Sequence, residues 1–223
     1  MKKTLIGVSA GLALCLSSYA FAKGDVYAPT DNPYTKTGFE VGIDAGWADY
    51  SMAGYGILGD EDTNNFAAGA HIGYNWELTN HPNLQFGAEF GYKYLGTLSD
   101  YGQGYLAVPG VDGAYLDHLR QHVLDLLLTA KYYVYQGFNL FGKAGVANVL
   151  QQTKYKGTVH SSSDSWSSSE DIWGLRPEVA LGAGYTFYKH LDVHVMYDHI
   201  ASDADSTSIV GSNTVLAGLS FVF

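Results

Sequence analysis

Three residues near the end of the chain have the types needed for nucleophilic catalysis. His199, Ser202 and Asp203 lie close together, and a histidine beside a hydroxyl and a carboxylate can activate a nucleophile. A polar segment rich in Ser and Asp also brings these types together by chance. We therefore expect no catalytic residues, and an enzymatic site at these positions is the alternative.

The 8 histidines raise the question of a metal site. His118 and His122 would share one face of a strand and could approach one another. No histidine spacing resembles a closed zinc site, and Cys15 is the only cysteine of the chain. We expect solvated histidines, with no metal and no cofactor.

A third group consists of charged residues inside segments that otherwise alternate between apolar and small residues. The cations are Lys93, Lys131, Lys143 and Arg176. The acids are Glu40, Asp44, Glu89, Asp125, Glu178, Asp192 and Asp198. The role of these charges depends on the elements that position them.

The segment 213–223, NTVLAGLSFVF, shows the alternation most clearly. Leu219, Phe221 and Phe223 share one parity, as a strand with one apolar face requires. The same pattern predicts seven further strands, at about residues 37–49, 65–77, 84–95, 119–135, 138–149, 173–187 and 191–200. Residues 119–128 would also suit a helix, but the alternation that resumes up to Tyr133 favours a strand.

The connections between these strands alternate between long and short. Loops are expected at residues 50–64, 96–118, 150–172 and 201–212, and short turns at 78–83, 136–137 and 188–190. The serine-rich segment 161–170 is expected to be mobile, because serine cannot bury apolar area. Pro177 predicts a bulge or a position near a rim. Eight strands joined in this way predict an all-β, antiparallel transmembrane barrel.

The two faces of the predicted strands differ in composition. Eleven strand glycines share the parity of the charged residues, and only Gly142 falls on the other parity. The apolar face carries one aromatic set at Trp47, Phe66, Tyr92, Tyr94, Trp173 and Tyr197, and a second set near the short turns. A soluble lipocalin-like barrel would turn its apolar face inward. Glycines and charges instead fit the narrow interior of an eight-stranded membrane barrel.

The interior charges are expected to pair with one another, since an unpaired charge inside a barrel is costly. Eight strands leave room for side chains but for no wide aqueous pore. A narrow, gated path for ions or small solutes through this network is the alternative.

The start of the chain predicts export. Lys2 and Lys3 precede an apolar run at 5–16, and 20–22 reads Ala-Phe-Ala, as in a secretory signal peptide. We expect a signal peptide at 1–22, a periplasmic lead-in at 23–36 and the barrel at 37–223. Loss of Lys2 and Lys3 takes the formal net charge from −10 to −12, and such acidity argues against nucleic acid as a partner.

With these features the sequence resembles the small outer-membrane β-barrels that include opacity-type surface antigens and the OmpA/OmpX-like barrels. The resemblance rests on the Ala-Phe-Ala site, on DLLLTAKYY at 125–133 followed by NLFGKAGV at 139–146, on Arg176-Pro177-Glu178 and on the closing Phe223. It implies a barrel in the outer membrane of a Gram-negative bacterium, with extracellular loops and both termini in the periplasm. It also implies recognition of Phe223 by the barrel-assembly machinery.

The specific role is expected to lie in the outer loops, because the barrel supplies anchorage and loops carry most recognition. We expect a non-enzymatic adhesin, surface antigen or structural barrel, surrounded by outer-membrane lipid and lipopolysaccharide and present as a monomer. Loop 96–118 contains Tyr101, Tyr105 and Tyr115 and suits contact with a host or environmental surface ligand. The alternatives are the narrow channel and, less favoured, a lipid A-modifying enzyme.

The location and the processing site can be tested together. The protein should fractionate with the outer membrane, change its gel mobility on boiling and begin at Lys23 in mass spectrometry. A soluble periplasmic protein whose mobility does not change on boiling would contradict the predicted barrel.

Overall fold

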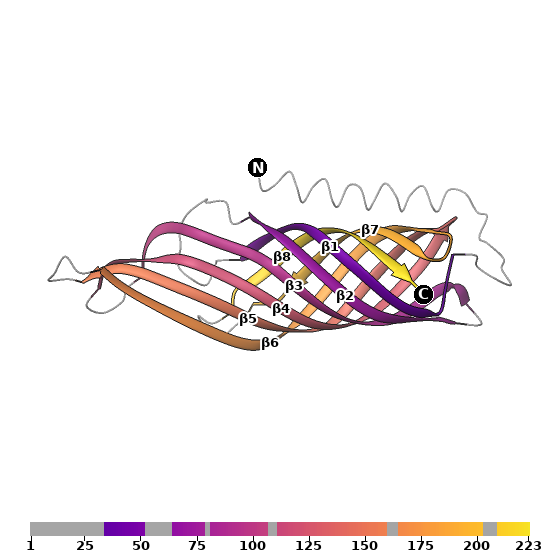
Figure 1. The fold of residues 1–223 in the computed structure, drawn as a ribbon, viewed down its shortest axis with the longest axis horizontal. Helices are drawn as coiled ribbons and strands as arrows, with labels where there is room; N and C mark the ends of the chain where they lie inside the picture. The colour runs from indigo at the N-terminus through magenta and orange to yellow at the C-terminus, as the bar shows by residue number, and fades with distance from the viewer. Residues whose placement is uncertain (1–33, 52–63, 79–80, 107–110, 160–164, 203–208) are drawn as a thin grey trace.

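The predicted barrel is present, with all eight strands. The computed structural model describes residues 34–51, 64–78, 81–106, 111–159, 165–202 and 209–223, of which 51, 64, 99–106, 111–117, 158–159 and 165–166 are described by backbone alone. The strands are β1 (Gly38–Ser51), β2 (Asn64–Leu78), β3 (His81–Leu106), β4 (Val111–Tyr135), β5 (Phe138–Val159), β6 (Ser165–Phe187), β7 (Leu191–Ile200) and β8 (Gly211–Val222). Each pairs with the next, and β1 pairs with β8 to close the barrel (Figure 1). Within the described residues, no helix is long and apolar enough to cross a membrane.

The strands are staggered around the barrel. Trp47 pairs with Phe66 of β2, but following the paired positions from Trp47 the other way around the barrel leads to Trp76. The difference of ten residues between Phe66 and Trp76 requires the strands to tilt by about 35–45° from the barrel axis. Because of this stagger, residues that lie at the same height along the barrel axis do not occupy equivalent positions within their strands.

The two faces lie as the parity predicts. Leu181 is 71% exposed and Leu128 67% on the outside of the barrel, whereas Glu178, three residues from Leu181, is 1% exposed. Both predicted aromatic sets lie on the outer face, with Trp47 66% and Phe39 69% exposed. The apolar face is therefore the one that meets lipid.

Two of the predicted short turns are β-turns with two central residues, called the two-residue turns below, and the second connection also contains His190 because β7 begins at Leu191. Gln136 and Gly137 have φ values of 41° and 85°, and Tyr188 and Lys189 have φ values of 51° and 67°. Positive φ at both central residues is the type I′ geometry, whose twist matches that of the flanking strands. The N–H of His190 donates to the carbonyl of Phe187 at 3.1 Å and closes the second turn.

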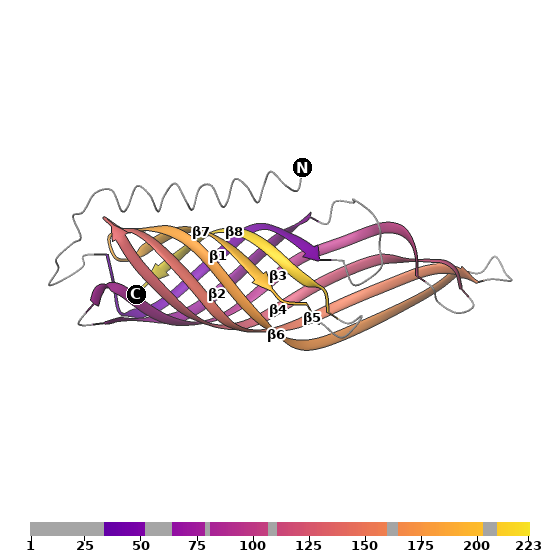
Figure 2. The ribbon, with the colours of Figure 1, turned by 180° about the vertical axis from the view of Figure 1, so that it is seen from behind.

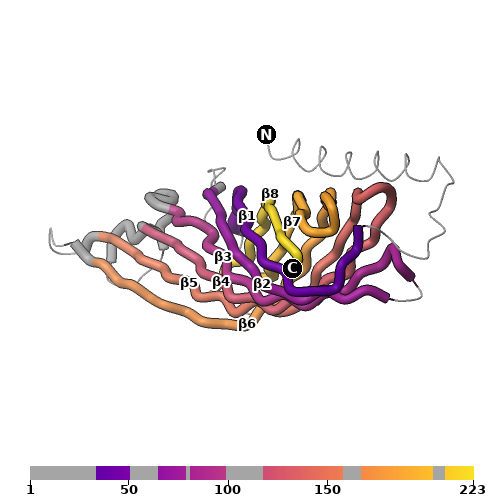
Figure 3. The backbone as a smooth tube through the Cα atoms, turned by 45° about the vertical axis from the view of Figure 1, so that its right-hand side comes forward, coloured from indigo at the N-terminus to yellow at the C-terminus, as the bar shows by residue number. Residues whose placement is uncertain are grey.

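The predicted loops 96–118 and 150–172 are wrong for most of their length. β3 continues to Leu106 and β4 begins at Val111, while β5 continues to Val159 and β6 begins at Ser165. The four strands β3–β6 have 26, 25, 22 and 23 residues, and the other four have 10 to 15. β3–β6 therefore run on together past the barrel as one sheet, called the projecting sheet below (Figures 1 and 2). Figure 3 shows the same extension from a third direction.

The serine-rich segment and the first short turn also need correction. Ser165–Ser169 pair with 154–158 of β5, so this part belongs to a strand, and residues 161–164 lie outside the described range. Backbone pairing supplies hydrogen bonds whatever the side chain, so a solvated sheet tolerates serine. Pro82, predicted in a turn, is the second residue of β3, a place where the missing N–H of proline is tolerated.

Pro177 lies at a rim, one of the two predicted settings. It pairs with Val146 of β5 in regular register, so there is no bulge. On its other side β7 has ended, since the last β6–β7 pair is Glu178 with Ile200. The Pro177 carbonyl accepts from the N–H of Ala201 at 3.1 Å, so its missing N–H also faces the region beyond β7.

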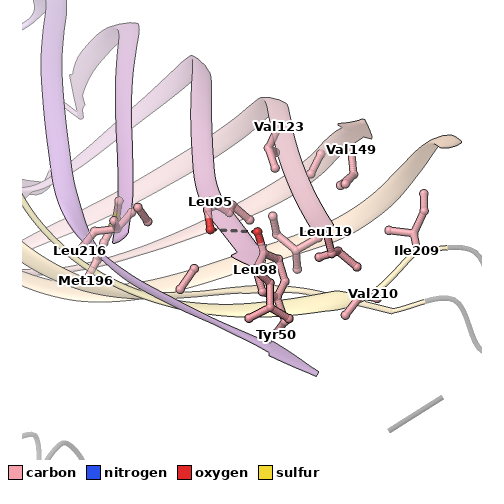
Figure 4. Close-up of a cluster of buried hydrophobic side chains, with 14 of the residues drawn as sticks. Tyr50, Leu95, Leu98, Leu119, Val123, Val149, Met196, Ile209, Val210 and Leu216 are labelled. Carbon is pink, nitrogen blue, oxygen red and sulfur yellow. Dashed lines mark hydrogen bonds between the residues drawn. The ribbon is translucent and has the colours of Figure 1, made fainter. Parts of the chain in front are cut away.

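The interior has two layers, of which only one is predicted by the sequence. Glycines and charges fill the half near the two-residue turns, as expected. The half near the projecting sheet holds an apolar cluster (Figure 4). Its members include Tyr50, Leu95, Leu98, Leu119, Val123, Val149, Ile200, Ile209, Val210 and Leu216. The Tyr50 hydroxyl donates to the Leu95 carbonyl at 2.9 Å, so the polar end of this ring is satisfied.

Predicted segments at the chain start lie outside the described residues. These comprise 1–33, which include the expected signal peptide and most of the lead-in. The last lead-in residues pack against the barrel, where the Gln85 side chain donates to the Lys36 carbonyl at 2.7 Å. The boundaries at 22 and 36 stay predictions.

The assignment of faces makes a stability prediction. Leu181→Arg should lower the free energy of unfolding by about 2–4 kcal/mol, because it places a charge in the lipid between the two aromatic sets. Gly182→Leu should instead overfill the interior, since a Cβ there would lie 2.6 Å from the Val195 carbonyl oxygen. Urea unfolding in bilayers measures both changes. Spin labels provide the control: the faces are reversed if a label at 178 meets lipid-soluble quencher and one at 181 does not.

Candidate functional site

The interior charges expected from the sequence come together in the barrel lumen. Lys93 of β3 reaches across to Asp198 of β7 with an Nζ–Oδ2 distance of 2.6 Å, and to Asp125 of β4 at 3.4 Å. It also forms an ion pair with Glu178 of β6. One ammonium thus serves three carboxylates, and Glu178 Oε2 and Asp198 Oδ1 have no hydrogen-bond partner within the described part of the chain.

Two further lysines pair lower in the lumen. Lys143 Nζ lies 2.6 Å from Glu89 Oε2, and the Thr129 hydroxyl donates to the other Glu89 oxygen at 2.9 Å. Lys131 Nζ lies 3.3 Å from Asp192 Oδ2. Asp192 also accepts hydrogen bonds from Thr186 at 2.7 Å and Asn139 at 3.0 Å. All these side chains are buried, so the expected paired network is present.

Two histidines belong to this network, so the expectation of solvated histidines is wrong for His71 and His194. Asp44 joins them: its Oδ2 lies 3.1 Å from His71 Nδ1, and its Oδ1 lies 2.8 Å from His194 Nε2. Both rings are buried, at 8% and 4% exposure. The signal was available, because both positions share the parity of the glycines and charges.

The same histidine has a serine neighbour. The Ser220 hydroxyl lies 3.3 Å from His71 Nε2, on the opposite side of the ring from Asp44. The order hydroxyl, imidazole, carboxylate is that of a nucleophilic triad. Here Ser220 is 2% exposed and faces the packed lumen, and Glu40 Oε1 lies 3.5 Å from the same Nε2. We therefore interpret His71 as a structural partner of the two buried acids Asp44 and Glu40.

Glycines make the room that these charges occupy. A Cβ at Gly91 would lie 3.1 Å from both Cγ and Oδ2 of Asp125, and one at Gly218 would lie 2.6 Å from His194 Nε2. Contacts this short would force the charged groups to move. The shared parity of the glycines along the strands therefore has a spatial cause: long polar side chains from one strand lie over the backbone of the next.

The outer half of the lumen is closed by a pair of glutamines and the start of β8. Gln121 Nε2 donates to Gln151 Oε1 at 2.9 Å and to the Val210 carbonyl at 2.8 Å. Gln151 Oε1 also accepts from the N–H of Val210 at 2.9 Å. Both glutamines are fully buried. They fasten Ile209 and Val210 inside the barrel, where these residues join the apolar cluster.

Arg176, expected in the interior network with the lysines, lies at the rim of the lumen, beyond the last pair of β6 with β7. It is half-buried at the level where β6 leaves the barrel, and its Nη1 donates to the Leu175 carbonyl at 3.0 Å. β6 has already passed the end of β7 at this residue, so part of the guanidinium reaches solvent.

The candidate rim site lies only partly within the described residues. His199 Nδ1 lies 2.9 Å from Asn213 Oδ1, and Tyr197 donates to the same oxygen at 2.6 Å. Ser202 is exposed, and Asp203 lies outside the described residues. His199 is therefore held by its cross-strand partner on the outer face.

The predicted His118 and His122 pair lies on the outer face of β4. His122 Nδ1 lies 2.7 Å from the Tyr92 hydroxyl, and its ring packs against Tyr94 with centroids 5.3 Å apart. His118 lies opposite Lys154 of β5. In the described part of the chain, no cluster of three or more His, Asp or Glu could hold a metal ion.

Comparison with known proteins agrees with this architecture. The sequence matches the family model of the OmpA-like transmembrane domain over residues 35–223. No curated protein matches it. Among solved structures, it is similar to neisserial surface protein A (NspA), with a TM-score of 0.49 and 14% identity over 83% of this chain and 97% of that chain.

Two further solved structures have similar folds. The attachment invasion locus protein Ail of Yersinia pestis gives a TM-score of 0.45 and 15% identity, covering 84% of this chain and 100% of that one. The N-terminal β-barrel domain of Pseudomonas aeruginosa OprF gives 0.46 and 14%, with 84% and 100% covered.

The shared ammonium of Lys93 makes a stability prediction. Lys93→Met should destabilise the barrel by about 3–5 kcal/mol, because it leaves three buried carboxylates without a counter-charge. Urea unfolding in bilayers measures this, with Lys154→Met on the exposed face as the matched control. Adding Glu178→Gln and Asp198→Asn to Lys93→Met should recover part of the loss. Equal stability of the two lysine variants would show that the interior pairs do not hold the barrel.

Proposed function

The chain belongs to the family of OmpA-like transmembrane domains and is an outer-membrane β-barrel, and we propose that it acts as a non-enzymatic surface protein through its projecting sheet. In this proposal the two-residue turns face the periplasm and the projecting sheet lies outside the cell. The contrast between tight turns at one end and long extensions at the other supports this orientation, since it is the usual arrangement in such barrels.

The observation that carries the proposal is the joint extension of β3–β6. Membrane anchorage needs strands of about 9–11 residues, and β3 and β4 have 26 and 25. On the β7 side, Ser165–Pro177 of β6 lies beyond the last paired residue of β7. The four neighbouring strands β3–β6 are all longer than a membrane crossing needs, and their extensions form one hydrogen-bonded platform, the projecting sheet. Such a platform suits contact with another surface at a small cost in ordering.

The β3–β4 end of the platform is the better candidate for the contact. Its sequence contains Tyr101, Tyr105 and Tyr115, and tyrosine supplies large contact area with a polar end. The β5–β6 end is rich in serine and acids, with Glu170 and Asp171 exposed. We therefore assign partner binding, as an adhesin or surface antigen, to the β3–β4 hairpin.

The alternatives are less well supported by the described residues. A narrow channel would have to displace the Gln121–Gln151–Val210 bonds and the apolar cluster above the ion pairs. A lipid A-modifying site at His199 would have to release the ring from Asn213. An adhesive role needs neither change.

Shortening each hairpin at a paired position tests the proposal. Residues 100–117 can be replaced by Asn-Gly next to the Ser99–His118 pair, and residues 156–167 by Asn-Gly next to the Tyr155–Ser168 pair. Cells displaying the first variant should lose adherence to immobilised fibronectin, laminin and epithelial cells, while the second variant keeps most of it. Both should retain heat-modifiable mobility, because the barrel register is unchanged.

Full adherence after both truncations would remove the projecting sheet as the contact surface. Large, steady conductance of the unmodified protein in planar bilayers would favour the channel instead. Loss of a lipid A acyl chain that depends on His199 would favour the enzyme.

A further inference from the structure

The outer face of the projecting sheet carries cations just beyond the aromatic side chains. Across β3, β4, β5 and β6, one row of paired outward residues is Tyr94, His122, Leu150 and Trp173. The next row toward the projecting end is Thr97, Arg120, Gln152 and Asp171. The row after that contains His118, Lys154 and Ser169. The sheet thus changes from aromatic to basic within two rows.

These cations are unusual for the chain. The net charge is −10, and three of the lysines, at 93, 131 and 143, are buried in the lumen. Among the strand residues that the structure describes, the outward-facing cations are Arg120, Lys154 and Lys156, all of them on β4 and β5. The chain is acidic overall, but these cations of the β4–β5 ladder form a local basic patch on its outer face.

The geometry of the patch suits a phosphate group. Arg120 and Lys154 are diagonal neighbours on adjacent strands, so their Cα atoms lie about 7–8 Å apart, within reach of one anion for long side chains. Both side chains are exposed. Arg120 Nε donates to the Thr97 hydroxyl at 3.1 Å, and Thr97 contacts the Tyr94 hydroxyl at 2.8 Å. This bond uses one of five guanidinium N–H donors and fixes the orientation of the group.

Asp171 is the acid facing the patch from the neighbouring strand. It lies two strands away from Arg120 with Gln152 between them, a separation of about 10 Å. At this distance between exposed groups the repulsion of a bound anion is largely screened by salt. The position opposite Lys154 on β6 is Ser169, which is neutral.

We propose that Arg120 and Lys154, with Tyr92 and His122 beneath them, bind the phosphate groups of lipopolysaccharide in the outer leaflet. This rests on the orientation in the proposed function. The patch begins where the lipid-facing aromatic residues end, so a ligand that fits it carries its anionic group at the boundary of an acyl region. A membrane-embedded phosphorylated glycolipid meets this requirement, and a free phosphate in solution has no reason to select this height.

The test uses the full mature protein in phosphatidylcholine bicelles. Bisphosphorylated lipid A, its dephosphorylated form and inorganic phosphate are titrated in, and amide chemical shifts at 118–124 and 150–156 are followed. Bisphosphorylated lipid A should shift these residues with saturation, and the other two probes should not. Arg120→Gln with Lys154→Gln should weaken binding by roughly fivefold for each cation removed. Lys189→Gln, in the exposed turn at the other end, is the matched control and should bind as the unmodified protein does.

Asp171→Asn should tighten binding, because it removes an acid that faces the patch. Equal affinity for dephosphorylated lipid A, or equal affinity of the double variant, would overturn the proposal, and saturable shifts with inorganic phosphate alone would show a general anion site instead. The hairpin truncations leave Arg120 and Lys154 in place. Loss of adherence with unchanged lipid binding, or the reverse, therefore tells which of the two proposals fails.

Discussion

The closed eight-stranded cross-section is the constraint on which this structure depends. A barrel of this size has room for side chains but not for water around each charge, so every interior ion needs a partner on another strand. Several of these partners lie on strands that are not adjacent. Lys93 joins β3 to β6 and β7, and Asp44 joins β1 to β2 and β7. These side-chain bonds cross the lumen and hold opposite strands together, whereas the backbone hydrogen bonds join only neighbouring strands.

The interior is divided along its axis into a charged half and an apolar half. The charged half lies inside the lipid-facing belt, where an outer apolar face and an inner polar face make the barrel stable in a membrane. The apolar half, fastened by Gln121, Gln151 and Val210, closes the lumen at the base of the projecting sheet. The projecting sheet therefore begins at a part of the barrel whose lumen is packed with apolar side chains. Its outer surface can vary in sequence with little effect on the barrel below.

The alternation of residue types was sufficient to predict the number of strands, their faces and the turns at 136–137 and 188–190. Inside a membrane both faces are constrained, one by lipid and one by the lumen, so the period of two is strong. Beyond the membrane the outer face is solvated, and Ser165–Ser169 can join a ladder without any apolar pattern. The strand extensions therefore left no clear signal.

Partners inside the lumen were predictable only as a group. Parity places His71, His194 and Asp44 on the inner face, but their meeting depends on the ten-residue stagger, which no single strand encodes. The insertion of Ile209 and Val210 depends on two glutamines that lie on β4 and β5, far away in the sequence.

The seam between β1 and β8 has a consequence for how the protein acquires its fold. Glu40 pairs with Val222, so this ladder joins the first strand of the barrel to the last, whereas every other ladder can form as a hairpin. Pairing across so long a loop is slow, and until it occurs both strand edges stay open. Asp44 meets His194 only when the seam is shut, so the lumen charges lose water at that moment. Seam closure is therefore the expected rate-limiting event of folding.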